Sequence, residues 1–145
     1  MPALWAYFDT SVLVKRYVNE VGSLRARGLF RRYRLITSVI APIEIISALC
    51  RRRAMGDVSG RDFSAIRARL MKDRAYWELA EISPLVLSQA EELIQRTILR
   101  TLDALHVATA VTFQALSGHR VPFITADQRQ REAAEQLKLH VEWVG

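Results

Sequence analysis

Residues 3–11 read ALWAYFDTS, an apolar run that stops at the carboxylate of Asp9 and the two hydroxyl side chains of Thr10 and Ser11. An uninterrupted apolar run predicts a central parallel strand, because such a strand is covered on both faces and does not alternate. Asp9 would then lie at the carboxyl edge of a sheet, where loops and helix N-termini gather around ligands. The same residue types also cap helices, so a purely structural role for Asp9, as the cap of a helix near Ser11, stays open at this point.

The composition indicates a single domain with a basic surface. The 145 residues are 50% hydrophobic, which suits one domain spanning residues 1–145. The net charge of +6 favours a polyanionic partner. Cys50 is the only cysteine, which excludes an internal disulfide and a cysteine-based metal cluster and indicates a reducing, cytoplasmic location. Charges or prolines interrupt every apolar stretch before about 18 residues, so we expect no membrane segment.

The rest of the chain alternates between short apolar runs and amphipathic segments. Strands are predicted at residues 35–38, 77–82, 121–125 and 139–144. Helices are predicted at 11–17, 23–33, 41–55, 60–76 and 84–97, then as a helix that is free of charges over 104–118, and last up to residue 137. In the helix at 84–97, Leu87, Ala90 and Ile94 are predicted to face the core. Strands that alternate with helices predict an α/β fold in which four to five strands form a mostly parallel sheet with right-handed crossovers.

Three further carboxylates lie in positions that need an explanation. Glu44 falls on a small, apolar helix face, where an unpaired charge is costly unless the side chain reaches water at the margin. Asp103 lies in the first turn of the most apolar helix, where the helix dipole alone could account for it. Asp127 follows the strand at 121–125, much as Asp9 follows the first strand. Two strand ends therefore present an aspartate.

A cluster of four carboxylates would need a cation. Two unit charges about 5 Å apart, at an effective dielectric constant of about 20, repel by roughly 3 kcal/mol, so four cannot all stay ionised alone. Mg²⁺ takes such oxygen ligands, keeps several waters and commonly bridges to phosphate. A metal-acidified water would then serve as nucleophile, so no histidine base is required. His106 could be a ligand or a base, but a lone histidine on an apolar helix is more often a hydrogen-bonded core residue, and we interpret it as one.

Four blocks of the sequence resemble the PIN domains, and among them the VapC-like ribonuclease toxins of toxin-antitoxin pairs. The blocks are FDTSVLVK (8–15), SVIAPIEIISAL (38–49), RTLDALHVATA (100–110) and ITAD (124–127). The resemblance implies a three-layer α/β/α domain with Asp9, Glu44, Asp103 and Asp127 as catalytic residues and ligands of Mg²⁺ or Mn²⁺, supported by Thr10, Ser11 and Thr125. It also implies a metal-dependent endoribonuclease that leaves a 5′-phosphate and a 3′-hydroxyl.

The end of the chain departs from the family pattern. Gln130 and Arg131 occupy positions that are usually apolar, and Lys138 replaces the usual glycine near the end of the last helix. These departures concern the packing of that helix and the position of Asp127. They leave the first three blocks untouched.

The resemblance also implies partners. Toxins of this family usually pair with a small antitoxin, here a VapB-like one, that covers the acidic site, and they usually form homodimers. RNA is the expected substrate. The candidate phosphate-binding residues are Arg16, Arg51, Arg52, Arg53 and Arg100.

Other functions stay open. A housekeeping RNA-processing PIN nuclease, or a non-catalytic PIN-like module that binds RNA or protein, would share the fold. The intact carboxylate quartet disfavours the non-catalytic module, because idle clustered carboxylates would destabilise the fold. A phosphatase of the haloacid dehalogenase type is disfavoured because it needs a second aspartate at the position of Ser11. A phospho-receiver domain is disfavoured because it needs a phosphorylatable aspartate at the end of its third strand, where this sequence has Ser83.

Overall fold

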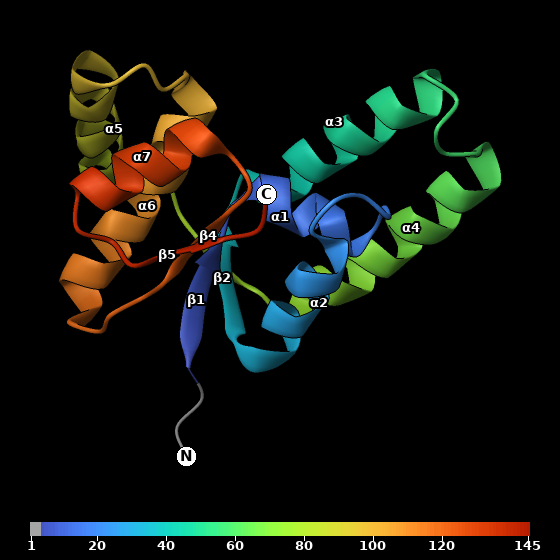
Figure 1. Ribbon diagram of the computed structural model, residues 1–145, viewed down its shortest axis with the longest axis horizontal. Helices are drawn as coiled ribbons and strands as arrows, with labels where there is room; N and C mark the ends of the chain where they lie inside the picture. The colour runs from blue at the N-terminus through green and yellow to red at the C-terminus, as the bar shows by residue number, and fades with distance from the viewer. Residues whose placement is uncertain (1–3) are drawn as a thin grey trace.

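The computed structural model describes residues 4–145, which form one sheet with helices on both faces (Figure 1). The strands are β1 (Trp5–Phe8), β2 (Arg34–Ser38), β3 (Glu78–Ala80), β4 (Phe123–Thr125) and β5 (Val141–Trp143). The helices are α1 (Thr10–Leu13), α2 (Ser23–Arg32), α3 (Ala41–Ala54), α4 (Gly60–Asp73), α5 (Pro84–Arg96), α6 (Thr101–Ser117) and α7 (Gln128–Gln136), with 3-10 turns η1 (Val14–Arg16) and η2 (Arg74–Tyr76). Ala3, in the predicted first strand, lies outside the described residues. Within these residues, no helix is long and apolar enough to cross a bilayer.

The five strands of this region are all parallel, in the order β3-β2-β1-β4-β5. This arrangement confirms the predicted α/β fold. The chain builds outward from β1 to β3 and then returns to add β4 and β5 on the other side of β1. The strand order therefore reverses between β1 and β4. Open α/β sheets bind ligands in the crevice at such a switch point, outside the carboxyl ends of the strands.

Each face of the sheet packs against its own group of helices, which gives the three expected layers (Figure 1). Phe8 and Ile124 point to the face covered by α1, α2, α3 and α4. Tyr7 and Phe123 point to the opposite face, covered by α5, α6 and α7. Because all four of these side chains are fully buried, the central strands β1 and β4 are apolar on both faces, as the run before Asp9 indicated.

Two strand-to-helix junctions bring acidic residues to the carboxyl edge of the sheet. Asp9 follows β1 and caps α1, where its Oδ1 accepts a hydrogen bond from the N–H of Val12 (3.3 Å). Asp127 follows β4 and caps α7, where its Oδ1 accepts from the N–H of Gln130 (3.0 Å). Capping and a place at the ligand edge are therefore compatible roles for Asp9.

Helix α6 begins at Thr101, shortly before the charge-free stretch that starts at Ala104. Its N-cap is Arg100, whose side chain makes no capping hydrogen bond, so the sequence carries no capping residue that marks this start. Asp103 still lies in the first turn, where the helix dipole favours a negative charge.

The buried face of α5 differs from the prediction. Val86, Ala90 and Leu93 are buried, whereas Leu87 and Ile94 are 47% and 38% exposed. Consecutive apolar residues near the start of this helix provide two possible stripes at helical spacing. Packing against α6, and not the pattern itself, selects the stripe that is buried.

A close contact fixes the end of the chain against the loop before α2. Gly22 has a φ of 86°, and a Cβ atom at this position would lie 2.1 Å from the carbonyl oxygen of Val144. Gly56 has nearly the same φ, 85°, but nothing lies within 4 Å of its Cβ position. The two glycines therefore share a backbone conformation and differ in packing.

Gly22→Ala should destabilise the protein more than Gly56→Ala. Both variants place alanine at a positive φ, which costs about 1–2 kcal/mol. Gly22→Ala adds an overlap with the Val144 carbonyl, which we expect to cost roughly 1–3 kcal/mol more. Urea unfolding of both variants measures the difference. Equal free energies of unfolding would contradict the close packing of the C-terminal segment.

Candidate active site

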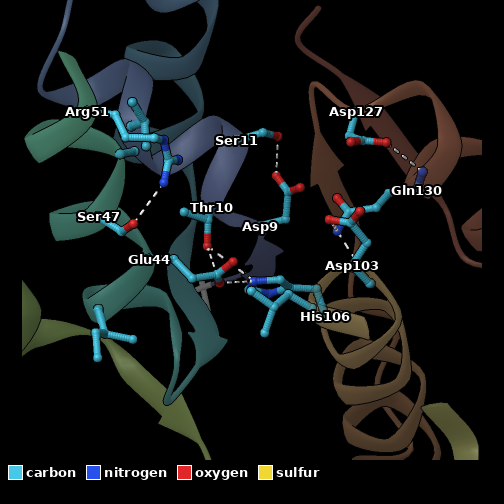
Figure 2. Close-up of a pocket in the computed structure, with 14 residues that line it drawn as sticks. Asp9, Thr10, Ser11, Glu44, Ser47, Arg51, Asp103, His106, Asp127 and Gln130 are labelled. Carbon is cyan, nitrogen blue, oxygen red and sulfur yellow. Dashed lines mark hydrogen bonds and ion pairs between the residues drawn. The ribbon is translucent and has the colours of Figure 1, made fainter. Parts of the chain in front are cut away.

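An open pocket of about 440 Å³ lies at the carboxyl edge of the sheet, at the switch point between β1 and β4. All four predicted carboxylates line it: Asp9, Glu44, Asp103 and Asp127 (Figure 2). They come from four segments, namely the ends of β1 and β4 and the first turns of α3 and α6. Residues from both ends of the chain thus meet in one place.

Asp9 is held from three sides. Its Oδ1 accepts hydrogen bonds from the hydroxyl of Ser11 (2.6 Å) and the N–H of Val12 (3.3 Å), and the hydroxyl of Thr125 lies 3.1 Å from Oδ2. The Ser11 oxygen in turn accepts from the N–H of Ala126 (3.0 Å). Ser11 and Thr125, the predicted supporting residues, therefore link the carboxyl ends of β1 and β4 through Asp9.

The environment of Asp9 disfavours its charge. The residue is only 2% exposed. Burial raises the pKa of its carboxyl to about 6, and the hydrogen bonds from Ser11, Thr125 and Val12 offset only part of this shift. At neutral pH Asp9 is therefore ionised at a cost in free energy, which a bound cation would relieve.

Glu44 reaches from α3 toward α6 and meets a buried histidine (Figure 2). Its Oε1 accepts a hydrogen bond from the hydroxyl of Thr10 (2.8 Å) and lies 2.6 Å from Nε2 of His106. The Glu44 side chain is 20% exposed, so it is neither fully buried nor free in water. His106 is 1% exposed, which agrees with its interpretation as a hydrogen-bonded core residue. The carboxylate on an apolar helix face is thus compensated by polar partners.

Asp103 and Asp127 lie across the pocket from Glu44 (Figure 2). Burial raises the pKa of the half-buried Asp103 carboxyl, and the negative charges of Asp127 and Glu44 raise it further. Solvent and salt screen charges that lie far apart, so carboxylates that raise one another's pKa lie close together. The carboxylates therefore form one electrostatic site and not separate surface charges.

Gln130 is a site residue that the sequence pattern did not identify. It is 1% exposed, and its Nε2 lies 3.4 Å from both the backbone oxygen and Oδ1 of Asp103. Its Oε1 lies 3.0 Å from the hydroxyl of Thr125, and its N–H is capped by Asp127. The indication of this role in the sequence was that Gln130 is a polar residue at a position that is usually apolar in the family. In this fold, that position contacts the site.

Two of the five candidate arginines lie near the carboxylates. Arg51 lines the pocket from α3, and its guanidinium donates a hydrogen bond to Ser47 (2.8 Å). Arg100 is exposed at the start of α6, and its positive charge counteracts the rise in the pKa of Asp103. Both arginines therefore place a positive charge near the carboxylates.

Arg16, Arg52 and Arg53 are engaged elsewhere. They contact, in order, the carboxylate of Asp73 (3.0 Å), the carboxylate of Glu20 and the ring of Phe63 (4.0 Å from guanidinium to centroid). None of the three lines the acidic pocket that residues 4–145 form. Arg16 in particular lies in a separate hollow with Asp73.

The donor set fits a hydrated, hard divalent cation. Within the described residues, no three Asp, Glu, His or Cys side chains are gathered closely enough to hold one ion together. Mg²⁺ is usually bound by only one or two carboxylates and keeps several waters, so it does not require a closed cage. The buried charge of Asp9 and the repulsion around Asp103 are the two features that such an ion would compensate.

The raised pKa of Asp9 predicts a pH dependence of stability in the metal-free protein. Between about pH 4 and pH 6 the folded state binds more protons at Asp9 than the unfolded chain does, so the free energy of unfolding falls as the pH rises. The difference between 3.8 and about 6 corresponds to roughly 3 kcal/mol. Asp9→Asn removes this loss, and we expect the variant to be more stable than the wild type at pH 7.

Urea unfolding in EDTA at a series of pH values tests this expectation. The wild type should lose stability between about pH 4 and pH 6 and Asp9→Asn should lose less. An unfolded variant, or the same fall in both proteins, would contradict the assignment.

Known proteins match the chain along nearly its whole length. The PIN domain family model matches residues 6–136. Ribonuclease VapC46 of Mycobacterium tuberculosis (strain ATCC 25618 / H37Rv) is 32% identical over 93% of this chain and 94% of its own. Ribonuclease VapC35 of Mycobacterium tuberculosis (strain CDC 1551 / Oshkosh) is 35% identical over 93% of both chains. The crystal structure of VapBC-5 from Mycobacterium tuberculosis, a member of the VapBC family of toxin-antitoxin systems, shares the fold with a TM-score of 0.65 at 16% identity, covering 99% of this chain and 100% of that chain. The chain belongs to the PIN domain family.

Proposed function

We propose that this protein is a Mg²⁺- or Mn²⁺-dependent endoribonuclease and the toxin of a toxin-antitoxin pair. The observation that carries the proposal is the gathering of Asp9, Glu44, Asp103 and Asp127 around one pocket at the switch point of the sheet. The related ribonucleases VapC46 and VapC35 support the reaction class, because each matches 93% of the chain. Hydrolysis of a phosphodiester is chemistry that a carboxylate-lined cation site can support.

In this proposal the carboxylates hold the cation and the pocket rim holds RNA. Asp9, oriented by Ser11 and Thr125, would bind the ion together with Asp103, Asp127 and Glu44. When bound, a divalent cation would acidify a water molecule and stabilise the negative charge that develops on the phosphate. No side chain of the site is then required to act as a general base.

The rim offers both charge and apolar surface to a nucleotide. Arg51 would contact a phosphate next to the cleaved bond, which positions the strand without reading its sequence. Ile43 and Leu102 line the same pocket and are 71% and 47% exposed. Apolar side chains at this place would pack against a base that is not paired, which favours single-stranded segments of RNA.

A VapB-like antitoxin is the proposed partner, and the cytoplasm is the proposed location. A pocket lined by carboxylates would accept an arginine side chain in charge-assisted hydrogen bonds. The solved VapBC-5 structure supports this partner class, since it belongs to a toxin-antitoxin system. A homodimer is also proposed, because Leu87, Ile94 and Ile98 leave exposed apolar surface on and beside α5.

Metal-dependent cleavage should require both Asp9 and Asp103. We expect Asp9→Asn and Asp103→Asn each to slow cleavage of a mixed RNA pool by about 10³-fold, since each removes a ligand whose loss costs several kcal/mol of transition-state stabilisation. EDTA should abolish cleavage by the wild type, and Mg²⁺ or Mn²⁺ should restore it. Asp57→Asn is the matched control, because Asp57 is exposed and lies outside the pocket.

The outcomes separate the alternatives. Cleavage that persists in EDTA, or in both site variants, would contradict the proposed mechanism. A wild type that binds RNA without cleaving it at any metal concentration would indicate the non-catalytic module. Growth arrest on expression of the wild type but not of Asp9→Asn would distinguish a toxin from a housekeeping RNA-processing nuclease.

Arg51 should contribute more to RNA binding than an arginine outside the pocket. Measured by fluorescence anisotropy in an Asp9→Asn background, Arg51→Ala should weaken binding and reduce the slope of log affinity against log salt by about one. Arg27→Ala removes the same charge from the exposed surface of α2 and is the control. Equal effects of the two variants would show that only the net charge matters.

A further inference from the structure

His106 connects the core of the domain to the pocket. Its ring lies between two oxygens. Nδ1 is 2.7 Å from the hydroxyl of Tyr7. Nε2 is 2.6 Å from Oε1 of Glu44 (Figure 2). The three residues come from β1, α3 and α6. Tyr7 is itself fixed, because its ring is fully buried and stacks on Phe123 with 5.5 Å between centroids. The ring of His106 is therefore held from the side that faces away from the pocket.

The hydrogen-bond partners define which ring nitrogen carries the hydrogen. The ordinary pKa of a tyrosine phenol is about 10, so the hydroxyl of Tyr7 carries its hydrogen at neutral pH. This hydroxyl lies 2.7 Å from Nδ1 of His106, and because the Glu44 carboxylate oxygen 2.6 Å from Nε2 can only accept, the hydroxyl donates to Nδ1. Nδ1 is then an acceptor, and in the neutral ring the hydrogen lies on Nε2, where it points at Glu44.

This arrangement uses one carboxylate oxygen of Glu44 and leaves the other unused. Oε1 receives two donors, the Nε2–H of His106 and the hydroxyl of Thr10 (2.8 Å). No residue between 4 and 145 donates a hydrogen bond to Oε2. A glutamate side chain has several rotatable bonds, and a mobile one loses conformational entropy when it binds a ligand. Because Oε1 is already held, this entropy cost of binding is smaller.

We propose that His106 is a positioning residue for Glu44: Tyr7 sets its tautomer, its Nε2–H holds Oε1, and Oε2 is thereby directed to the divalent cation. The inference rests on the proposed metal site and adds a residue to it that binds no metal itself. It also assigns Nε2 a permanent partner, so His106 does not serve as the base. Loss of such an outer contact typically weakens metal binding by about 10- to 100-fold.

Two amide variants separate the contact to Glu44 from simple filling of the core. The amide nitrogen of glutamine can reach the place of Nε2, whereas that of asparagine reaches only the place of Nδ1. We expect His106→Gln to bind Mn²⁺ within about threefold of the wild type and His106→Asn to bind it at least about 10-fold more weakly. Calorimetric titration of the metal-free proteins measures both affinities without any RNA, and urea unfolding checks that both variants are folded.

The ring nitrogens of His106 in the metal-free wild type provide a readout that needs no variant. Nitrogen-15 NMR should show hydrogen on Nε2. Hydrogen on Nδ1 alone, or equal Mn²⁺ affinities for folded His106→Asn and wild type, would overturn the inference while leaving the metal site intact. A wild type that binds no Mn²⁺ would instead overturn the proposed function, and with it the role assigned to His106.

Discussion

The burial of the Asp9 carboxylate is the constraint around which the site is arranged. With 2% of its surface exposed, Asp9 accepts hydrogen bonds from residues that follow β1 and from a residue that ends β4. These donors join the two central strands at their carboxyl ends, yet they do not fully compensate the charge. The same side chain therefore stabilises the junction of strand and helix, and its negative charge remains only partly compensated.

The two sides of the pocket treat their carboxylates differently. Glu44 is satisfied by hydrogen-bond donors of the protein, Thr10 and His106, and one of its oxygens is fully used. Asp103 has the opposite surroundings, since neighbouring negative charges add to the effect of burial. One side is thus rigid before any ligand arrives, and the other is held in a repulsive arrangement that a ligand would relax. This difference suits a site whose geometry is formed before the ligand binds but whose negative charge is balanced only by the ligand.

The sequence was informative where function coincides with a strand end and silent where it depends on packing. Asp9 and Asp127 could be predicted, because each follows an apolar run that had to be a central strand. Tyr7 could not, since within that run it looked like any other core residue, and its hydroxyl acquires a role only when α6 places His106 beside it. The stripe of α5 that faces the core depended on tertiary contacts in the same way. Lys138 has a φ of 62°, which explains why glycine is usual there in the family.

The strand order has a consequence for how the protein is made. β1 is synthesised first but lies between β2 and β4, so one of its edges stays unpaired until residues 123–125 have left the ribosome. For the same period Asp9 lacks its partner Thr125, Ser11 lacks Ala126, and Asp103 lacks Gln130. An incomplete nascent chain therefore has acidic residues but no assembled centre. Completion of the last third of the chain is the step that creates one, and any cut before β4 leaves a fragment without it.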